Sequence, residues 1–284
     1  MAESPSHQEI AAMFTIIVLV TAYVLIPPVE VLLSGPSKRS RRANLGMIAP
    51  TMITSGLVGV ALAGVATYGH AHGVGLAAWL ELPQAIEVAL VVALLDLAAY
   101  VDHRFRHRLT SLWRIHRAHH TDTEVDVTTS LRNHPLDVAM IVAVSSAATL
   151  ALGASPTAVA LSGAIGVIFA VWDHLRIALP GRLERALSLV IQTPGMHRVH
   201  HAPDRPQTDS NFGLIFSIWD HMFGTFGAPD PHCLVGLNTL DLAERQTMRA
   251  MLADPWRRQL KPTIIANSDA THLVQREHSP TPSP

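Results

Sequence analysis

The sequence predicts an all-α fold: an integral membrane helical bundle with a cytoplasmic cap rich in histidine. Three observations lead to this fold class. Of the 284 residues, 49% are hydrophobic and only 15% are charged, which is typical of a chain that lies largely in lipid. The hydrophobic residues fall into long runs, several of them as long as the roughly 20 residues that a membrane-crossing helix needs. The polar segments between these runs carry histidines that recur at helical spacing.

Charge and cysteine content exclude several classes of protein. The formal net charge of −1 gives no sign of the basic surface that nucleic acid requires, so no nucleic-acid partner is expected. Cys233 is the only cysteine, so the chain can form no intrachain disulfide and offers no thiolate pair to a metal. Nothing in the cysteine content argues for an oxidising compartment.

The N-terminal region, residues 1–84, is expected to hold the first membrane helices and a basic loop. The apolar run at residues 10–33 is the first candidate span, and the residues before it lack the positive charges of a cleavable signal peptide. The basic cluster at residues 38–42 is expected to stay in the cytoplasm by the positive-inside rule. The N-terminus is therefore predicted to lie outside, with a second span at residues 45–68.

The central region, residues 85–228, is expected to hold the histidine-rich domain. A third span at residues 85–101 crosses back to the cytoplasm, so the histidines that follow emerge on that side. Two shorter apolar runs, 136–152 and 157–172, flank a Gly-Ala-Ser-Pro turn and predict a helical hairpin. Their length leaves open whether they cross the membrane fully.

Asp96 lies within the third span, where an ionisable side chain is costly and faces a partner or a cavity. It precedes His103 by two helical turns and so lies on the same helix face. One interpretation is that its carboxylate supports the histidines by orienting an imidazole. The alternative is an aspartate paired with an arginine or with water near the membrane surface.

The C-terminal region, residues 229–284, is expected to contribute one short helix and a tail. Asp241 can cap an amphipathic helix that runs through Leu252 and ends before Pro255. From Lys261 on, the composition is typical of a disordered segment.

Three histidine groups point to a metal site. One has the pattern HxxxH and two have the pattern HxxHH. The groups are His103 with His107, His116 with His119 and His120, and His197 with His200 and His201. Histidines three or four residues apart share a helix face, and imidazole suits zinc, copper, iron and nickel. A single histidine at a membrane edge is more often a solvated polar residue, but that account does not explain three groups.

The two HxxHH groups resemble each other at an offset of 81 residues. One interpretation is that each group serves one metal of a pair. The other interpretation is that two unrelated segments converged on the same histidine pattern.

The order of these groups resembles that of the fatty acid hydroxylase/sterol desaturase superfamily. The resemblance includes three further motifs: Asn133-His134-Pro135 between the groups, and Ser210-Asn211-Phe212-Gly213 and Trp219-Asp220-His221-Met222-Phe223-Gly224-Thr225 after them. The similarity covers roughly residues 85–228. It implies a membrane-bound non-haem di-iron oxygenase with two iron ions as cofactors and O2 as co-substrate. The implied ligands are His103, His107, His116, His119, His120, His134, His174, His197, His200 and His201. Asp96 and Asn211 are the candidate supporting residues, and the role of His221 is left open.

The function implied by the resemblance is hydroxylation or desaturation of a lipid, with a sterol, a fatty acyl chain, a carotenoid or an ether lipid as substrate. Such a reaction needs electrons, yet the chain has no GxGxxG motif for a nicotinamide or flavin and too few cysteines for an iron–sulfur cluster. A separate electron donor, a ferredoxin or cytochrome with its reductase, is therefore expected on the cytoplasmic face.

Five arginines near the first two groups are expected on the surface, facing lipid headgroups or an acidic electron carrier: Arg104, Arg106, Arg108, Arg114 and Arg117. Two other functions stay open, a histidine-rich metal-binding protein or transporter and a zinc-dependent membrane hydrolase. Transporters place their ligands near the middle of the membrane, whereas these histidines follow helix ends. A zinc hydrolase needs only about three protein ligands.

Overall fold

The structure is a computed structural model that describes Glu30 and residues 41–80, 82–237 and 246–257. Apart from Glu30, the predicted first span and the C-terminal tail lie outside the described residues, so both stay predictions. The described elements are α-helices and short 3-10 helices, with no strand in these ranges. The all-α prediction is confirmed for this part of the chain.

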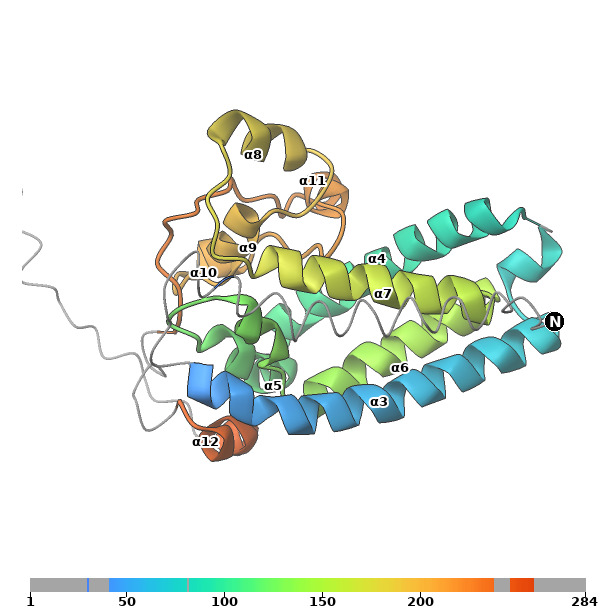
Figure 1. Cartoon of the computed structure of the whole chain (residues 1–284), viewed down its shortest axis with the longest axis horizontal. Coiled ribbons are helices and arrows are strands. Elements are labelled where there is room, and N and C mark those ends of the chain that lie inside the picture. Colours follow the sequence, from blue (N-terminus) through green and yellow to red (C-terminus); the bar gives the residue numbers. More distant parts are fainter. Residues whose placement is uncertain (1–29, 31–40, 81, 238–245, 258–284) are drawn as a thin grey trace, which may run out of the picture.

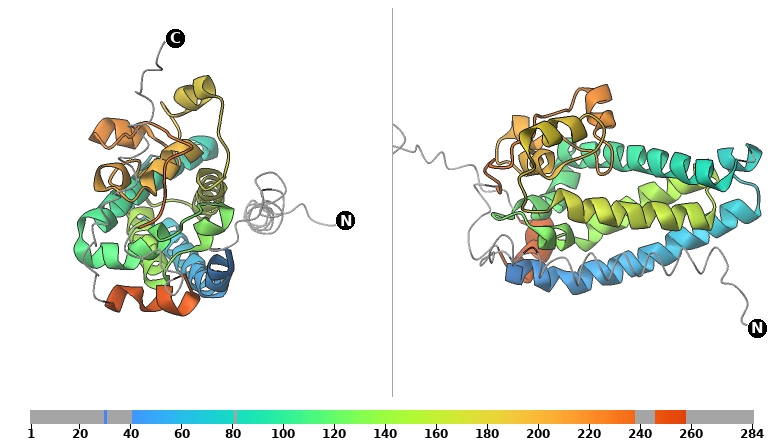
Figure 2. Two further views of the ribbon diagram at one scale, coloured as in Figure 1. Left: turned by 90° about the vertical axis from the view of Figure 1, so that its left-hand side faces the viewer. Right: turned by 45° about the horizontal axis from the view of Figure 1, so that its top comes forward.

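Four long helices form a bundle: α3 (Arg41–Ala71), α4 (Gln84–Arg108), α6 (Pro135–Leu152) and α7 (Pro156–Asp173). They run side by side in every view of the ribbon (Figures 1 and 2). Each is long and apolar enough to cross a membrane, so the second and third predicted spans and both arms of the hairpin are confirmed as helices. The 18 residues of α6 or α7 extend about 27 Å, close to the ~30 Å of a hydrocarbon core.

The bundle buries small residues inside and turns large apolar ones outward. Ala66, Ala154 and Ala158 are fully buried where α3 and α4 pack against α7, because small side chains let membrane helices pack closely. Leu57 and Val60 on the outer face of α3 are 70% and 75% exposed. An apolar outer surface of this extent is suited to lipid and not to water.

The turn between α6 and α7 follows from its sequence. Gly153 ends α6 with a φ of 67°, a conformation that favours glycine. A Cβ at this position would also lie 2.3 Å from the carbonyl oxygen of Val74. Ser155 caps α7 by accepting a hydrogen bond from the backbone of Ala158, and Pro156 takes the first helical position. The predicted turn is confirmed.

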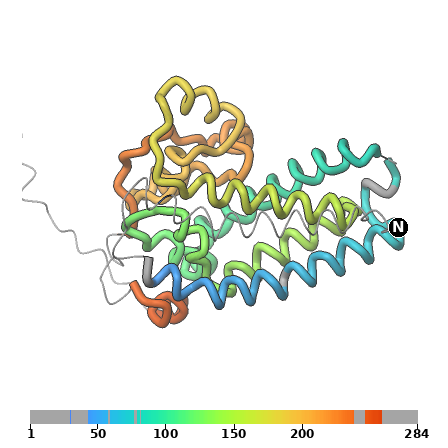
Figure 3. Tube along the Cα trace, in the orientation of Figure 1, coloured from blue at the N-terminus to red at the C-terminus, as the bar shows by residue number. Residues whose placement is uncertain are grey.

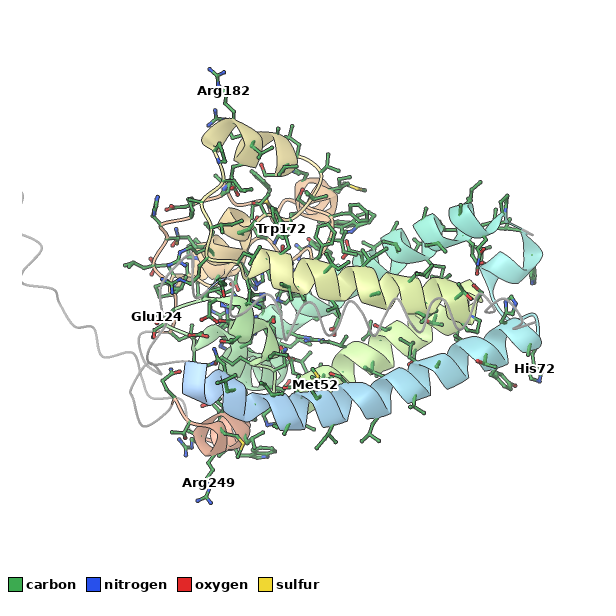
Figure 4. The ribbon with its side chains drawn as sticks, in the orientation of Figure 1. Met52, His72, Glu124, Trp172, Arg182 and Arg249 are labelled. Carbon is green, nitrogen blue, oxygen red and sulfur yellow. The ribbon has the colours of Figure 1, made fainter. Side chains whose placement is uncertain are left out.

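The remaining helices gather mainly at one end of the bundle, where they form a cap (Figure 3). They are α5 (Thr110–His120), η3 (Val127–Leu131), α8 (Gly181–Leu187), α9 (Pro194–His200), α10 (Arg205–Thr208), α11 (Ile218–Phe223), α12 (Met248–Ala253) and η5 (Asp254–Trp256). Thr247 caps α12, and the predicted capping residue Asp241 lies outside the described residues. The other end carries η2 (Leu76–Trp79) and His72 (Figure 4).

Candidate metal centre

Nine of the ten predicted ligand histidines come together in two adjacent clusters in the cap. The first cluster contains His103, His107, His116, His120 and His200, and the second contains His119, His174, His197 and His201. Within each cluster, one potential ligand atom of every member lies within 4.8 Å of those of the others. The clusters touch where the rings of His120 and His201 stack, with centroids 4.6 Å apart.

Four helix ends deliver these side chains. The last two turns of α4 carry His103 and His107, and the C-terminal half of α5 carries the next group. His174 is the residue that ends α7, so the hairpin returns the chain to the cap. Thr193 fixes the start of α9 by accepting a hydrogen bond from the backbone of Met196.

The HxxHH group on α5 is divided between the two clusters. His116 and His120, four residues apart, lie on one face and join the first cluster. His119 joins the second cluster, because successive residues point about 100° apart around a helix.

The HxxHH group on α9 is divided in the opposite sense. His197 and His201, again four residues apart, join the second cluster, while His200 joins the first. The interpretation that each HxxHH group serves one metal is therefore wrong. Both helices contribute to both clusters, because α5 and α9 each present two adjoining faces to the space between them.

The spacing of the ring nitrogens suits ligands of one ion. The Nε2 atom of His116 lies 3.1 Å from that of His103 and 3.2 Å from that of His120. In the second cluster the Nε2 distances are 3.1 Å for His197 with His174, 3.1 Å for His197 with His201 and 3.3 Å for His174 with His119. Two imidazole nitrogens that each lie about 2.0–2.1 Å from a metal are roughly 3 Å apart when their bonds are near a right angle.

Hydrogen bonds at the far side of the rings leave Nε2 free to bind a metal. The Nδ1 atoms donate to backbone carbonyls in three histidines: His103 to Phe212 at 3.0 Å, His200 to Ser210 at 2.7 Å and His174 to Ala170 at 2.6 Å. A carbonyl oxygen only accepts, so Nδ1 carries the hydrogen and Nε2 keeps its lone pair. The Nε2 atoms of His107 and His200 are buried without a hydrogen-bond partner in the described part of the chain. A metal ion would satisfy both.

A carboxylate that the sequence analysis missed supports the first cluster. Asp137, in the first turn of α6, accepts a hydrogen bond from Nδ1 of His116 at 2.9 Å. It also pairs with Arg106 at 2.9 Å, and Arg106 pairs in turn with Asp102. An ionisable residue near the start of an apolar run was the available signal.

Burial keeps the ligand histidines outside the bundle helices neutral. It lowers the pKa of His174 to about 4 and the pKa of His200 to about 3. Burial, followed by the effect of neighbouring imidazoles, also lowers the pKa of His119, His120, His197 and His201 well below the usual value. A neutral imidazole presents a lone pair to a metal ion at neutral pH.

His134 and His221 lie outside both clusters. His134 precedes α6, where its Nδ1 accepts from the backbone of Leu136 and its Nε2 contacts the carbonyl of Leu252 at 3.1 Å. Both of its ring nitrogens are therefore engaged away from the clusters. His221 contacts the Ser188 carbonyl through Nε2 and stacks on Phe226.

Asp96 does not orient an imidazole directly. Its two oxygens accept hydrogen bonds from the backbone of Ile215 and Phe216, at 2.9 and 3.0 Å, and from the indole of Trp219, at 2.8 Å. Seven residues along a helix extend about 10 Å, too far for a hydrogen bond to His103. Asp96 instead fastens the loop that follows the SNFG motif to α4.

Asn211 holds that loop from its other side. It adopts a φ of 54°, and its amide donates to the carbonyls of Met196 and Gly227 at 3.0 and 3.1 Å. The carbonyls of its neighbours Ser210 and Phe212 are the acceptors for two ligand histidines. Asn211 therefore supports the ligands through the backbone and not by contact.

The predicted arginine surface is wrong for two of its five members. Arg106 and Arg117 are only 3% and 2% exposed, because each is drawn into an ion pair with aspartate. The partner of Arg117 is Asp254 of η5. Arg104, Arg108 and Arg114 are at least partly exposed.

One cavity of about 200 Å³ opens onto both clusters. Its histidine wall consists of His103, His116, His119, His174 and His197. Its other walls come from α4, α6, α7 and the loop after Phe212, with the apolar side chains Ala99, Ile141, Val144, Ala170 and Leu214. The arrangement can bring an apolar substrate beside two metal positions at once.

Comparisons with known proteins agree with this site. A family model described as fatty acid hydroxylase matches residues 88–225, which include every member of both clusters. Ornithine lipid hydroxylase OlsE of Rhizobium tropici is 27% identical over 199 residues, covering 70% of this chain and 59% of that protein. Alkylglycerol monooxygenase of Homo sapiens is 31% identical over 143 residues, covering 50% of this chain and 31% of the enzyme. The Danio rerio enzyme is 33% identical over 143 residues, with the same coverage.

The chain spans 59% of the length of the first relative and 31% of the length of the two monooxygenases. No solved structure matches it significantly. The matched residues, 88–225, nevertheless contain both histidine clusters and the cavity that joins them, and this part of the chain belongs to the fatty acid hydroxylase family.

Proposed function

We propose that this protein is a membrane-bound non-haem di-iron oxygenase that hydroxylates a lipid with O2 and electrons from an external donor. The observation that carries the proposal is an apolar cavity onto which both histidine clusters open. A carbon atom in this cavity would lie beside both metal positions.

The ligand set is consistent with iron. The two clusters contain nine imidazoles and no carboxylate. Imidazole accepts several transition metals, so the requirement for reduction of O2 is what selects a redox-active ion. Two iron ions held by the clusters would supply the redox chemistry that inserts one oxygen atom of O2 into a C–H bond. Overall, a lipid C–H group, O2, two electrons and two protons give an alcohol and water.

The chain's own residues bind the lipid and exclude water. Ile141 and Val144 on α6 and Leu214 in the loop offer an apolar wall to an alkyl or acyl chain. A dry cavity also protects a reactive centre from side reactions with water. Because the cavity lies among α4, α6 and α7, we propose that the chain of the lipid enters from within the membrane.

The names of the relatives favour hydroxylation over desaturation. One is a lipid hydroxylase and the others are monooxygenases. We therefore propose that the product carries a new hydroxyl group. A membrane lipid with an alkyl or acyl chain is the proposed substrate class.

We propose that the clusters and the C-terminus lie in the cytoplasm and the N-terminus outside. The basic cluster at residues 38–42 supports this orientation. The cap and His72 lie at opposite ends of the bundle, so they would face opposite sides of the membrane (Figure 4). The electron donor, a ferredoxin or cytochrome with its reductase, would then dock on the cytoplasmic cap.

A metal transporter or a zinc-dependent hydrolase fits these residues less well. The clusters lie at helix ends in the cap, away from the middle of the bundle where transporters bind ions. A hydrolytic zinc site needs about three protein ligands and has no use for nine.

The test is lipid profiling by mass spectrometry of cells that express the wild-type chain, His119→Ala or His72→Ala. His72 is the matched control, because it is exposed at the far end of the bundle. The proposal expects a lipid heavier by one oxygen atom with the wild type and with His72→Ala, and its loss with His119→Ala. A product lighter by two hydrogens would indicate desaturation instead, and a product that persists in His119→Ala would contradict the assignment.

A further inference from the structure

A second cavity lies on the face of α4 that points away from the histidines. Its volume is about 240 Å³, and it is lined by Tyr100, Val101, Arg104, Phe105, Arg108 and Phe223. The α4 residues that line the substrate cavity are Ala99, Asp102, His103 and Arg106. At about 100° per residue, the two sets lie on opposite faces of the helix. The outer cavity is therefore separate from the proposed substrate site.

Two arginines, Arg104 and Arg108, line this outer cavity. Arg104 and Arg108 lie one helical turn apart, and neither forms an ion pair in the described part of the chain, unlike Arg106. The Nε atom of Arg104 is buried without a hydrogen-bond acceptor among the described residues, and its Nη1 atom donates to the Tyr100 hydroxyl at 3.5 Å. Two adjacent guanidinium groups without a carboxylate favour binding of a phosphate.

The surroundings of these arginines are apolar and uncovered. Phe105 is 52% exposed and Phe223, on α11, is 44% exposed. The neighbouring Met222 is 65% exposed. Apolar side chains in this number beside a membrane-crossing helix are suited to contact with lipid chains. The arginines lie at the end of that helix, where a headgroup would sit.

We propose that the outer cavity binds one anionic phospholipid, with its phosphate between Arg104 and Arg108 and an acyl chain along Phe105 and Phe223. The cavity matches both parts of this molecule, a phosphodiester and an apolar chain. The bound phospholipid is a structural ligand of the α4–α11 corner and is distinct from the substrate.

A chain of hydrogen bonds connects this cavity to the first histidine cluster. The Tyr100 hydroxyl and the Thr225 hydroxyl are 2.8 Å apart, and Thr225 donates to Oδ1 of Asp220 at 2.7 Å. The same Asp220 oxygen accepts from the backbone of Phe212 at 2.8 Å, and the Phe212 carbonyl accepts from His103. The outer cavity is therefore connected by direct hydrogen bonds to the loop that orients His103.

Native mass spectrometry of the purified full-length chain tests this site, with phosphatidylglycerol as the probe and phosphatidylcholine as its comparison. The wild type should retain one phosphatidylglycerol, and Arg104→Gln with Arg108→Gln should lower that retention at least about tenfold, since each basic residue near a lipid surface contributes about 1 kcal/mol. The matched control is Arg182→Gln with Arg249→Gln, which removes two exposed arginines that point away from the bundle at opposite sides of the cap (Figure 4). The control should retain the lipid.

A second measurement needs no variant. Short-chain phosphatidylglycerol should raise the melting temperature of the wild type in a concentration-dependent way, because a ligand of the native state stabilises it. Inorganic phosphate or a neutral diacylglycerol of the same chain length should have a much smaller effect. Equal retention by the glutamine pair and the wild type would overturn the proposal. Equal stabilisation by the neutral lipid would overturn it as well.

Discussion

His116 donates its Nδ1 hydrogen to Asp137 across 2.9 Å, so a ligand on α5 is held by the first turn of α6. The second oxygen of that carboxylate accepts from Arg106, which also pairs with Asp102. All four side chains are buried. The proposed first metal position therefore depends on an ion network that ties α4, α5 and α6 together.

Asp137→Asn should weaken metal binding at the first cluster about 10–100-fold, because the charge that orients the His116 imidazole is lost. The measurement is iron retention against a chelator. Asp209→Asn is the control, since Asp209 is 41% exposed and lies 3.3 Å from Nδ1 of His107. Its effect should be clearly smaller, and equal losses from the two variants would contradict the role given to Asp137.

Asp96→Ala should destabilise the protein by about 3–5 kcal/mol, because one buried and two partly buried donors lose the carboxylate that accepts from them. Unfolding in detergent would measure this loss. Trp219→Phe removes only one of the three hydrogen bonds and should cost a fraction of that amount. A loss from Asp96→Ala no larger than that from Trp219→Phe would show that the backbone donors of Ile215 and Phe216 contribute nothing.

Two double variants on α9 should have different metal contents. His197→Ala with His201→Ala removes two ligands from the second cluster and none from the first, so about one ion per chain should remain. His200→Ala with His201→Ala removes one ligand from each cluster and should lower occupancy of both positions. Elemental analysis and iron spectroscopy would compare them. Identical metal contents and spectra would contradict the division of the group between the clusters.

Single cysteines introduced at opposite ends of the bundle should label from opposite sides of the membrane. With Cys233 replaced, Thr123→Cys stands next to Glu124 in the cap and His72→Cys at the far end (Figure 4). A membrane-impermeant thiol reagent added to intact cells should label His72→Cys only. Labelling of Thr123→Cys from outside would reverse the proposed orientation.

The helices and most of the histidines that gather in the cap could be predicted from the sequence, because both depend on local pattern. The run predicted at 85–101 lies within α4, and the HxxHH spacing placed the histidines on helix faces. The division of the histidines between the two clusters could not be predicted, because it depends on how α5 and α9 face each other across the cap. His134 shares the residue type of a ligand, but its position at the start of α6 turns its ring elsewhere.

The burial of two arginines also could not be read from the sequence. Arg106 finds Asp137 at a separation of 31 residues, and Arg117 finds Asp254 at a separation of 137. Only the tertiary arrangement brings these carboxylates opposite the guanidinium groups. The local cluster of positive charge therefore predicted a surface of five arginines, two of which are buried.

The metal content of the purified chain from iron-replete cells tests the central claim most directly. The two clusters predict two iron ions per chain in the wild type, and reduced content in both His119→Ala and His200→Ala, since each removes a ligand from a different cluster. One ion or none in the wild type, or full content in both variants, would contradict the account.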